Sequence, residues 1–358
     1  MTEDLRSHLV PLPPQPADVP WPTGDWPSST TPPPSDAAAA IEEMFDDHER
    51  FERTYAVLVV HHGELVSERY ADVLEHWDRS AEVIDRDTPL LSWSMAKSML
   101  HAAVGIAVGD GLLDLDAPAP VPEWASADDP RRTITLEHLL TMRDGLDFNE
   151  DYVDGETSHV IEMLFGSGQV DVARFAASRP LLVEPGTRFN YSSGTSNIVA
   201  RILGDAVRDA LGTDVQAFLT ERLFAAIGMP RAEPRVDEAG TFVGSSYVYA
   251  PAREMAKFGL LYLRDGVWDG ARVLPEGWVD HGRRQRSWEP DDQTGYGAHW
   301  WTTGDERGTF RAAGYQGQAI VICPVHDLVI VRMGKTDAAH AGDLTAWRTR
   351  MVEAFDGF

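Results

Sequence analysis

Ser94-Met95-Ala96-Lys97 places a hydroxyl and an amine three residues apart in a chain whose 31 basic residues include only three lysines. On a helix, residues i and i+3 lie one turn apart on the same face, so the Lys97 amine can reach the Ser94 hydroxyl. A neighbouring base turns serine into a strong nucleophile, and burial lowers the pKa of lysine far enough for it to accept the proton. Arginine stays protonated and cannot do so. The tetrapeptide therefore indicates a nucleophile beside its general base.

The residues that follow predict a buried helix. The stretch 95–108 is apolar nearly all round, which is typical of a helix at the centre of a large domain, and Gly109-Asp110-Gly111 ends it. At the start of such a helix the backbone N–H of Ser94 lacks a helical partner, so we expect it to form half of an oxyanion hole. The alternative interpretation is a helix-capping serine with a surface lysine one turn on.

The composition is that of an ordinary globular protein with a large core. The chain has 358 residues and 43% hydrophobic content, and its formal net charge of −26 disfavours nucleic acid and anionic membranes as partners. Cys323 is the sole cysteine, which excludes an internal disulfide and a clustered-cysteine metal site. Zinc-type and phosphate-binding motifs are absent from the sequence, so we expect neither a metal nor a cofactor.

The N-terminal residues give an expectation for the cellular compartment of the protein. Met1-Thr2-Glu3-Asp4-Leu5 is acidic and is not a basic region followed by an apolar stretch, so the sequence predicts no secretory signal. No apolar run reaches membrane-spanning length. We therefore expect a cytoplasmic protein, and the sequence leaves its oligomeric state open.

The first part of the chain is rich in proline. Residues 1–36 contain 10 of the 23 prolines, a density that excludes helix and central strand, so we predict an extended arm. Trp21 and Trp26 lie within this arm and indicate that it packs onto the body of the protein. The alternative interpretation is a Pro-rich peptide ligand.

The remaining pattern predicts an α/β fold with a helical insertion. A hairpin precedes the Ser94 helix and strand-like runs return near the C-terminus, so both ends of the chain must share one antiparallel sheet flanked by helices. We predict an α/β subdomain from residues 37–110 and 243–358, with a mainly helical subdomain, residues 111–242, inserted in it. The expected helices span 37–51, 136–142, 159–165, 170–177, 196–211, 215–227 and 342–355, and the expected strands span 55–60, 64–70, 296–302, 309–313, 318–323 and 328–333.

A serine–lysine pair also needs a group that passes the proton to the leaving group and a second donor for the oxyanion. Tyr191 lies in a Gly/Ser-rich turn before a predicted helix, where its phenol can protrude into a cleft; the alternative is a tyrosine packed at a domain seam. Gly314 ends a predicted edge strand and lets the backbone approach a ligand, so the Tyr315 N–H can face the oxyanion. The alternative for this stretch is a hairpin turn.

In their order along the chain, these residues resemble the motifs of the penicillin-recognising serine hydrolases. Ser94-Met95-Ala96-Lys97 is similar to the first motif and Tyr191-Ser192-Ser193 to the Tyr-x-Asn/Ser second motif. Ala312-Ala313-Gly314 stands where the Lys-Thr-Gly or His-Thr-Gly third motif occurs. The resemblance is to the class C β-lactamase-like branch, with its esterases, D-aminopeptidases and nylon-oligomer hydrolases, and it runs from about Trp21 to the C-terminus. It implies a β-lactamase/transpeptidase-like fold.

Residues 146–154 and 300–308 resemble the nylon-oligomer (6-aminohexanoate-dimer) hydrolases in particular. In that group the tyrosine that matches Tyr152 lies on a mobile loop, closes over the substrate and hydrogen-bonds the amide leaving group, so the resemblance implies a substrate-binding role for Tyr152. The first stretch is also acidic, which favours a solvated loop over the alternative, a loop that steers a cationic amine. Its acidic residues are Asp147, Glu150, Asp151 and Asp154.

Two departures from the family pattern disfavour a β-lactamase. Ala312 stands where lactam-binding relatives have lysine, so the charge that would grip a lactam carboxylate is missing. Ser193 replaces an asparagine, so the side-chain amide of the second motif is missing as well.

We predict an intracellular serine hydrolase that cleaves a small carboxylic ester or linear amide through an acyl-enzyme. Ser94 attacks the carbonyl, Lys97 accepts its proton and Tyr191 relays that proton to the leaving group, while the Ser94 and Tyr315 N–H groups hold the oxyanion. One alternative is a D,D-peptidase or β-lactamase, whose cell-wall substrates lie outside the membrane. The other is a non-catalytic ligand-binding module with the same fold. The candidate substrate-binding residues are Tyr152, Ser193, Gly314 and Gln318.

Overall fold

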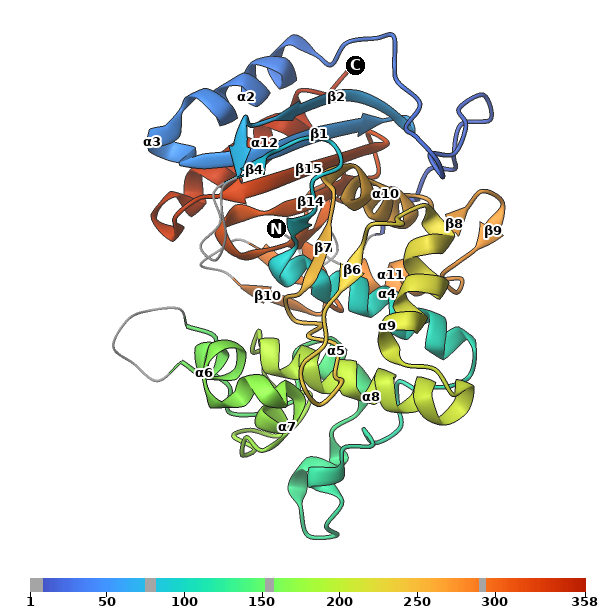
Figure 1. Cartoon of the computed structure of the whole chain (residues 1–358), viewed down its shortest axis with the longest axis vertical. Helices are drawn as coiled ribbons and strands as arrows, with labels where there is room; N and C mark the ends of the chain where they lie inside the picture. The colour runs from blue at the N-terminus through green and yellow to red at the C-terminus, as the bar shows by residue number, and fades with distance from the viewer. Residues whose placement is uncertain (1–8, 75–81, 152–157, 290–293) are drawn as a thin grey trace.

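An eight-stranded antiparallel sheet forms one half of the molecule, drawn at the top of Figure 1. The computed structural model describes residues 9–74, 82–151, 158–289 and 294–358. The strand order within these ranges is β10-β11-β12-β13-β14-β15-β1-β2. The strands are β1 (Arg53–His61), β2 (Glu64–Tyr70), β10 (Ser287–Glu289), β11 (Thr294–Tyr296), β12 (Trp301–Thr302), β13 (Phe310–Ala313), β14 (Ala319–Cys323) and β15 (Leu328–Lys335).

β1 joins the two ends of the chain in this sheet. Val59 of β1 pairs with Ile330 of β15 on one side and with Ser67 of β2 on the other. His62 and Gly63 connect β1 to β2 with φ angles of 51° and 79°, as expected for a two-residue hairpin turn whose twist matches that of the strands. The N-terminal and C-terminal segments therefore share one sheet, which confirms the fold class predicted from the sequence.

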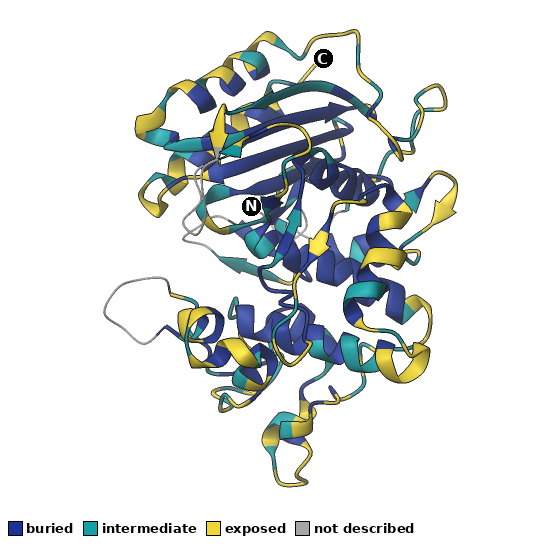
Figure 2. Ribbon diagram, viewed as in Figure 1, coloured by how far each residue is buried: buried dark blue, intermediate teal, exposed yellow. Residues whose placement is uncertain are grey.

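Helices cover both faces of the sheet, so its central strands are dark blue in Figure 2. α2 (Ser35–Asp46) and α12 (Ala341–Glu353) pack on one face, where they meet alternate residues of β1. α10 (Ala252–Leu263) packs on the opposite face. A strand covered on both sides needs apolar residues at successive positions, and the run 56–60 of β1 is completely buried.

The other half of the molecule is mainly helical (Figure 1). α8 (Ser193–Leu211) packs there against α5 (Leu136–Leu140) and α7 (Val172–Ala177). It also contacts α4 (Ala96–Gly109). Residues 96–107 of α4 are all buried, as their apolar pattern predicts. No helix in the described ranges carries an apolar run long enough to cross a bilayer. The remaining helices and strands are α3 (His48–Phe51), α6 (His159–Phe165), α9 (Val215–Phe218), α11 (Trp278–Arg283), β3 (Val73–Leu74), β4 (Glu82–Val83), β5 (Leu90–Leu91), β6 (Glu233–Pro234), β7 (Val248–Ala250), β8 (Val267–Trp268) and β9 (Ala271–Arg272).

Four predicted elements differ from the structure. The helix expected over 37–51 is divided into α2 and α3, because Asp47 between them has a non-helical backbone conformation. The helix expected from residue 196 begins at Ser193, because the Ser192 hydroxyl caps it by accepting a hydrogen bond from the Thr195 N–H (3.0 Å). The strand expected over 296–302 is divided into β11 and β12, because His299 between them has a φ of 56°, outside the extended region. The helix expected over 215–227 is only one turn of α-helix, followed by a π-helical and a 3₁₀ turn.

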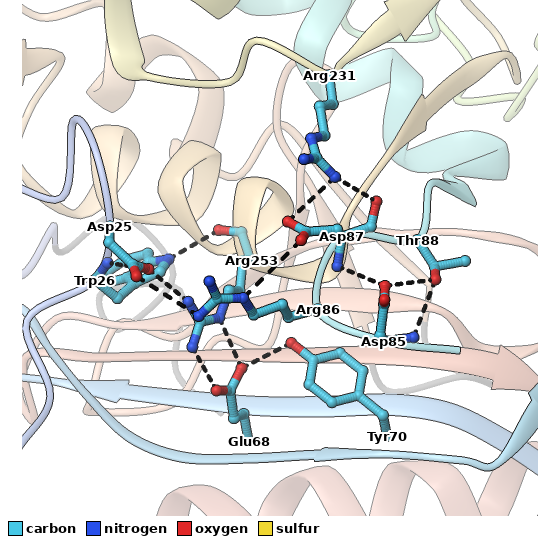
Figure 3. Close-up of polar contacts among 10 residues, drawn as sticks. All are labelled: Asp25, Trp26, Glu68, Tyr70, Asp85, Arg86, Asp87, Thr88, Arg231 and Arg253. Carbon is cyan, nitrogen blue, oxygen red and sulfur yellow. Dashed lines mark hydrogen bonds and ion pairs between the residues drawn. The ribbon is translucent and has the colours of Figure 1, made fainter. Parts of the chain in front are cut away.

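The proline-rich segment before α2 lies against the body of the protein. Trp26 is buried and its indole N–H donates to the main-chain oxygen of Arg253 on α10 (3.0 Å). Figure 3 shows that the Arg253 guanidinium also joins Asp25 of this segment to Glu68 of β2. Trp21 packs on Trp268, with ring centroids 5.2 Å apart.

Candidate active site

Ser94 lies in a single 3₁₀ turn, Trp93–Met95, immediately before α4. The chain enters this turn from β5, which pairs with β7, and the Ser92 N–H donates to the Val248 carbonyl (2.9 Å). Trp93 has a φ of 45°, a left-handed conformation that is strained for a bulky residue. The pairing of β5 and the bond from Ser92 hold this strained turn in place, so the position of the Ser94 side chain is well defined.

Lys97 projects from the first turn of α4 and is 1% exposed. Its ammonium donates to the Ser94 Oγ (2.9 Å), the Ser193 Oγ (3.0 Å) and the Ser245 carbonyl oxygen (2.9 Å). Ser94 is not the N-cap of α4, because that position is Met95. The alternative of a capping serine and a surface lysine is therefore wrong.

The environment of Lys97 lowers the proton affinity of its amine. Burial lowers the pKa of Lys97 to about 8, although the negative charge of Glu150 acts in the opposite direction. A lysine with this pKa is partly neutral near physiological pH, and only the neutral amine can accept the Ser94 proton.

Tyr191 precedes the N-cap of α8, and its ring lies against the lysine, with Lys97 Nζ 4.9 Å from the ring centroid. Trp301 and Tyr296 flank the same ring at centroid distances of 5.1 and 5.9 Å. Burial and the charge of Glu150 raise the pKa of Tyr191 well above its usual value of 10, and its interaction with the Ser94 side chain acts against this rise. The phenol is therefore protonated at neutral pH and can donate a proton or a hydrogen bond.

Ser193 links the lysine to a carboxylate. Its backbone N–H donates to Glu150 Oε2 (2.7 Å) and its hydroxyl donates to Glu150 Oε1 (2.5 Å). The interpretation of residues 146–154 as a solvated acidic loop is thus wrong for Glu150. Asp147 forms an ion pair with Arg179 (3.5 Å), and Asp151 is exposed.

The prediction of an edge strand before Gly314 is wrong, because β13 lies between β12 and β14, and residues 314–318 form the hairpin connection from β13 to β14. The end of β13 approaches the Ser94 turn closely. A Cβ atom on Gly314 would lie 2.6 Å from the Ser92 carbonyl oxygen, so only glycine permits this approach. Tyr315 begins the next turn, and its ring meets Trp93 edge-on at a centroid distance of 5.7 Å. The structure thus places the Tyr315 backbone beside the Ser94 turn, and its role in the oxyanion hole stays a prediction.

The other predicted site residues are less directly connected to Ser94. Gln318 is buried, and its main-chain oxygen accepts a hydrogen bond from the Gly314 N–H (2.7 Å), so its role in substrate binding also stays a prediction. Tyr152 and Asp154 lie outside the described residues. Ala312 is buried in the hydrophobic core, where it contributes no charge.

Sequence reasoning missed two contributors to the site. Ser245 supplies a carbonyl acceptor to Lys97, and its own N–H donates to Asn197 Oδ1 on α8 (3.1 Å). A main-chain acceptor leaves no residue-type signal, so nothing in the sequence marks this position. Glu150 was recognised as acidic, but its pairing with Ser193 depends on two segments that only the fold brings together. Across the described residues, no group of three or more His, Cys, Asp and Glu is arranged to hold a metal ion.

Comparisons with known proteins identify the family and the fold. Residues 38–354 match the Beta-lactamase family. The 6-aminohexanoate-dimer hydrolase of Paenarthrobacter ureafaciens is 29% identical over 316 residues, which cover 80% of this chain and 74% of the relative.

Two solved structures share the fold. "Putative 6-aminohexanoate-dimer hydrolase from Bacillus anthracis" has a TM-score of 0.73 at 20% identity and covers 98% of this chain and 92% of its own. A family VIII carboxylesterase has a TM-score of 0.67 at 16% identity and covers 90% of this chain and 96% of its own. The family match and the shared fold both extend over most of the sequence, and the chain belongs to the Beta-lactamase family of serine hydrolases.

Proposed function

We propose that this protein cleaves a small carboxylic ester or a linear amide through a covalent acyl-enzyme on Ser94. The observation that carries the proposal is the contact between Lys97 Nζ and Ser94 Oγ at 2.9 Å, made by a lysine that is almost completely buried. A hydroxyl within hydrogen-bond distance of an amine with a lowered pKa is the arrangement of an activated serine.

The first half of the reaction forms the acyl-enzyme. The Ser94 Oγ–H bond breaks as its proton passes to neutral Lys97, and the oxygen forms a bond to the substrate carbonyl carbon. The negative charge that develops on the carbonyl oxygen is stabilised by the N–H groups of Ser94 and Tyr315. Tyr191 then passes the proton from Lys97 to the leaving amine or alcohol, and the bond between the acyl carbon and that group breaks.

The second half releases the acid. A water molecule attacks the acyl carbon, its proton passes to Lys97 or Tyr191, and the bond to Ser94 Oγ breaks so that the serine regains its proton. No redox step or cofactor is needed for the atoms and charges to balance.

The choice of an ester or linear amide follows from the relatives and from Ala312. The P. ureafaciens relative is named for the hydrolysis of a 6-aminohexanoate dimer, and a carboxylesterase shares the fold. A β-lactam carboxylate requires a nearby cation, and Ala312 supplies none at the third motif. A D,D-peptidase or β-lactamase is therefore the weaker alternative.

Labelling with a fluorophosphonate tests the activated serine, because this probe reacts with a serine whose proton is removed by a base. We expect one adduct by intact mass, mapped to Ser94 by peptide analysis, and no adduct on Ser94→Ala. The same preparation is then assayed with short p-nitrophenyl esters, a linear amide and a penicillin. We expect kcat/KM for the esters to exceed that for penicillin by about a hundredfold or more. The absence of labelling would favour a non-catalytic module, and equal specificity constants for ester and penicillin would favour a β-lactamase.

A further inference from the structure

We propose that Glu150 is a positioning residue that acts on Lys97 through Ser193, so that a hydroxyl and a carboxylate extend the nucleophile–base pair. This inference rests on the proposed function of Ser94 and Lys97. In serine hydrolases with a Ser-His-Asp triad, an aspartate orients the histidine base and stabilises its charged form. We infer that Glu150 has the corresponding role toward Lys97.

The hydrogen-bond directions follow from the chemistry of the groups. An ionised carboxylate can only accept, so the Ser193 hydroxyl must give its single proton to Glu150 Oε1 (2.5 Å). The lone pairs of the Ser193 oxygen then accept from the Lys97 ammonium (3.0 Å). A second bond, from the Ser193 N–H to Glu150 Oε2 (2.7 Å), fixes the orientation of the carboxylate. The chain of contacts therefore runs from Ser94 through Lys97 and Ser193 to Glu150.

Glu150 differs from the other titratable neighbours of Lys97 in carrying a charge. The titratable groups that face Lys97 in the described part of the chain are Glu150, Tyr191 and His299. Tyr191 is a neutral phenol at neutral pH, and burial lowers the pKa of His299 to about 3, so the imidazole is uncharged as well. Glu150 is thus the one charge in this set that can balance a positive Lys97.

Glu150 matters most in the step that transfers the Ser94 proton to Lys97. When the Ser94 proton reaches Lys97, a buried ammonium forms, and burial of an unpaired charge is costly. Glu150 stabilises that ammonium through the Ser193 hydroxyl without a direct salt bridge that would keep the amine protonated. The same field raises the pKa of Lys97, so Glu150 also sets the acidic limb of the pH–rate profile.

The sign of the expected change is definite. Glu150→Gln removes the negative charge and keeps the shape, so the pKa of Lys97 falls further below its present value of about 8. The acidic limb of kcat/KM then moves to lower pH by roughly one unit, because the amine stays neutral in more acidic solution. The plateau falls by about tenfold, because the ammonium formed in the transition state loses its counter-charge.

Direct titration of the lysine separates this effect from structural damage. The chain has only Lys97, Lys257 and Lys335, so the protein labelled with ¹³Cε-lysine gives three resonances, assigned with Lys257→Arg and Lys335→Arg. The Lys97 resonance is followed against pH in the wild type and in Glu150→Gln. Asp151→Asn is the matched control, because it removes the same charge from an exposed neighbour.

We expect the Lys97 titration and the kinetic limb to move down together in Glu150→Gln and to stay in place in Asp151→Asn. In a Ser193→Ala background the additional effect of Glu150→Gln should fall to less than half, because the connecting hydroxyl is gone. Equal effects in the two backgrounds, or an unshifted Lys97 titration in folded Glu150→Gln, overturns the proposal. The titration needs no substrate, so it measures the effect of Glu150 on Lys97 whether or not the protein is active. Lack of activity in the wild type would contradict the proposed function alone.

Discussion

Lys97 and Lys257 are both buried lysines with lowered pKa values, yet their surroundings give them different tasks. Lys97 is 1% exposed and Lys257 is 5% exposed, and burial lowers the pKa of each. Each also has a glutamate whose charge acts against the effect of burial, Glu150 for Lys97 and Glu254 for Lys257.

The acceptors of the two ammonium groups differ. Lys257 donates to the carbonyl oxygens of Gly24 (2.8 Å) and Gly228 (2.6 Å), which have no proton to exchange. Two of the three acceptors of Lys97 are serine hydroxyls, which can lose or pass on a proton. Burial alone therefore does not identify a general base. Lys257 ties the N-terminal arm to the body, whereas the acceptors of Lys97 fit the proton transfer that we propose for it.

Substitution of Lys97 is expected to have the largest effect on activity. Lys97→Arg keeps the positive charge but cannot accept a proton, so kcat/KM for a p-nitrophenyl ester should fall by about a thousandfold or more. Lys335→Arg is the control, because this third lysine is exposed. Circular dichroism must show that both variants are folded. Near-native activity in folded Lys97→Arg would show that the base is another group.

Tyr191 provides a second test of the difference between the two lysines, because its ring lies beside Lys97. Tyr191→Phe keeps the ring against the ammonium and removes only the proton relay, so kcat should fall by about a hundredfold for esters and amides alike. A matched ester and amide pair measured at the same pH checks this expectation. A loss confined to the amide would mean that Tyr191 assists only the poorer leaving group.

The smallest effect on activity is expected for Lys257. Lys257→Met leaves the Gly24 and Gly228 carbonyls without their donor, so the free energy of unfolding should fall by about 1–3 kcal/mol, while kcat/KM changes by less than about twofold. Urea denaturation and an ester assay at 25 °C measure the two quantities, with Lys335→Met as the exposed control. A large loss of activity at unchanged stability would assign a chemical task to Lys257 and remove the contrast.

Local patterns predicted part of the site and the fold. The i, i+3 spacing of Ser94 and Lys97 and the apolar sequence of α4 follow from helix geometry, so their contact and the burial of Lys97 could be expected. The sharing of one sheet by both ends of the chain followed from where strand-like runs occur. Short-range rules are sufficient for the Ser94–Lys97 contact and for α4, because the interacting residues are close in sequence or repeat with a regular period. The shared sheet is a non-local feature, and it could be expected only because a helical segment separates the two groups of strand-like runs.

Other features depend on contacts between distant segments. The pairing of Glu150 with Ser193 joins a loop to the first turn of α8, and no sequence pattern connects them. The left-handed conformation of Trp93 is maintained by the β5–β7 pairing around it, against the preference of a tryptophan. The division of 296–302 into two strands likewise reflects His299, whose N–H donates to the Leu140 carbonyl in the helical half (3.1 Å).

The pairing of β1 with β15 also determines the order in which the structure around Ser94 can form during synthesis. A ribosome completes β1 well before its partner β15, because the segments from β2 to β14 lie between them in the sequence. Until then β1 can pair with β2, but the sheet that supports α10 and the end of β13 cannot close. Non-local strand pairing of this kind folds slowly and leaves apolar surface exposed on the nascent chain. The Ser94–Lys97 pair is thus translated well before β15, and the structure around the pair can close only after β15 has emerged.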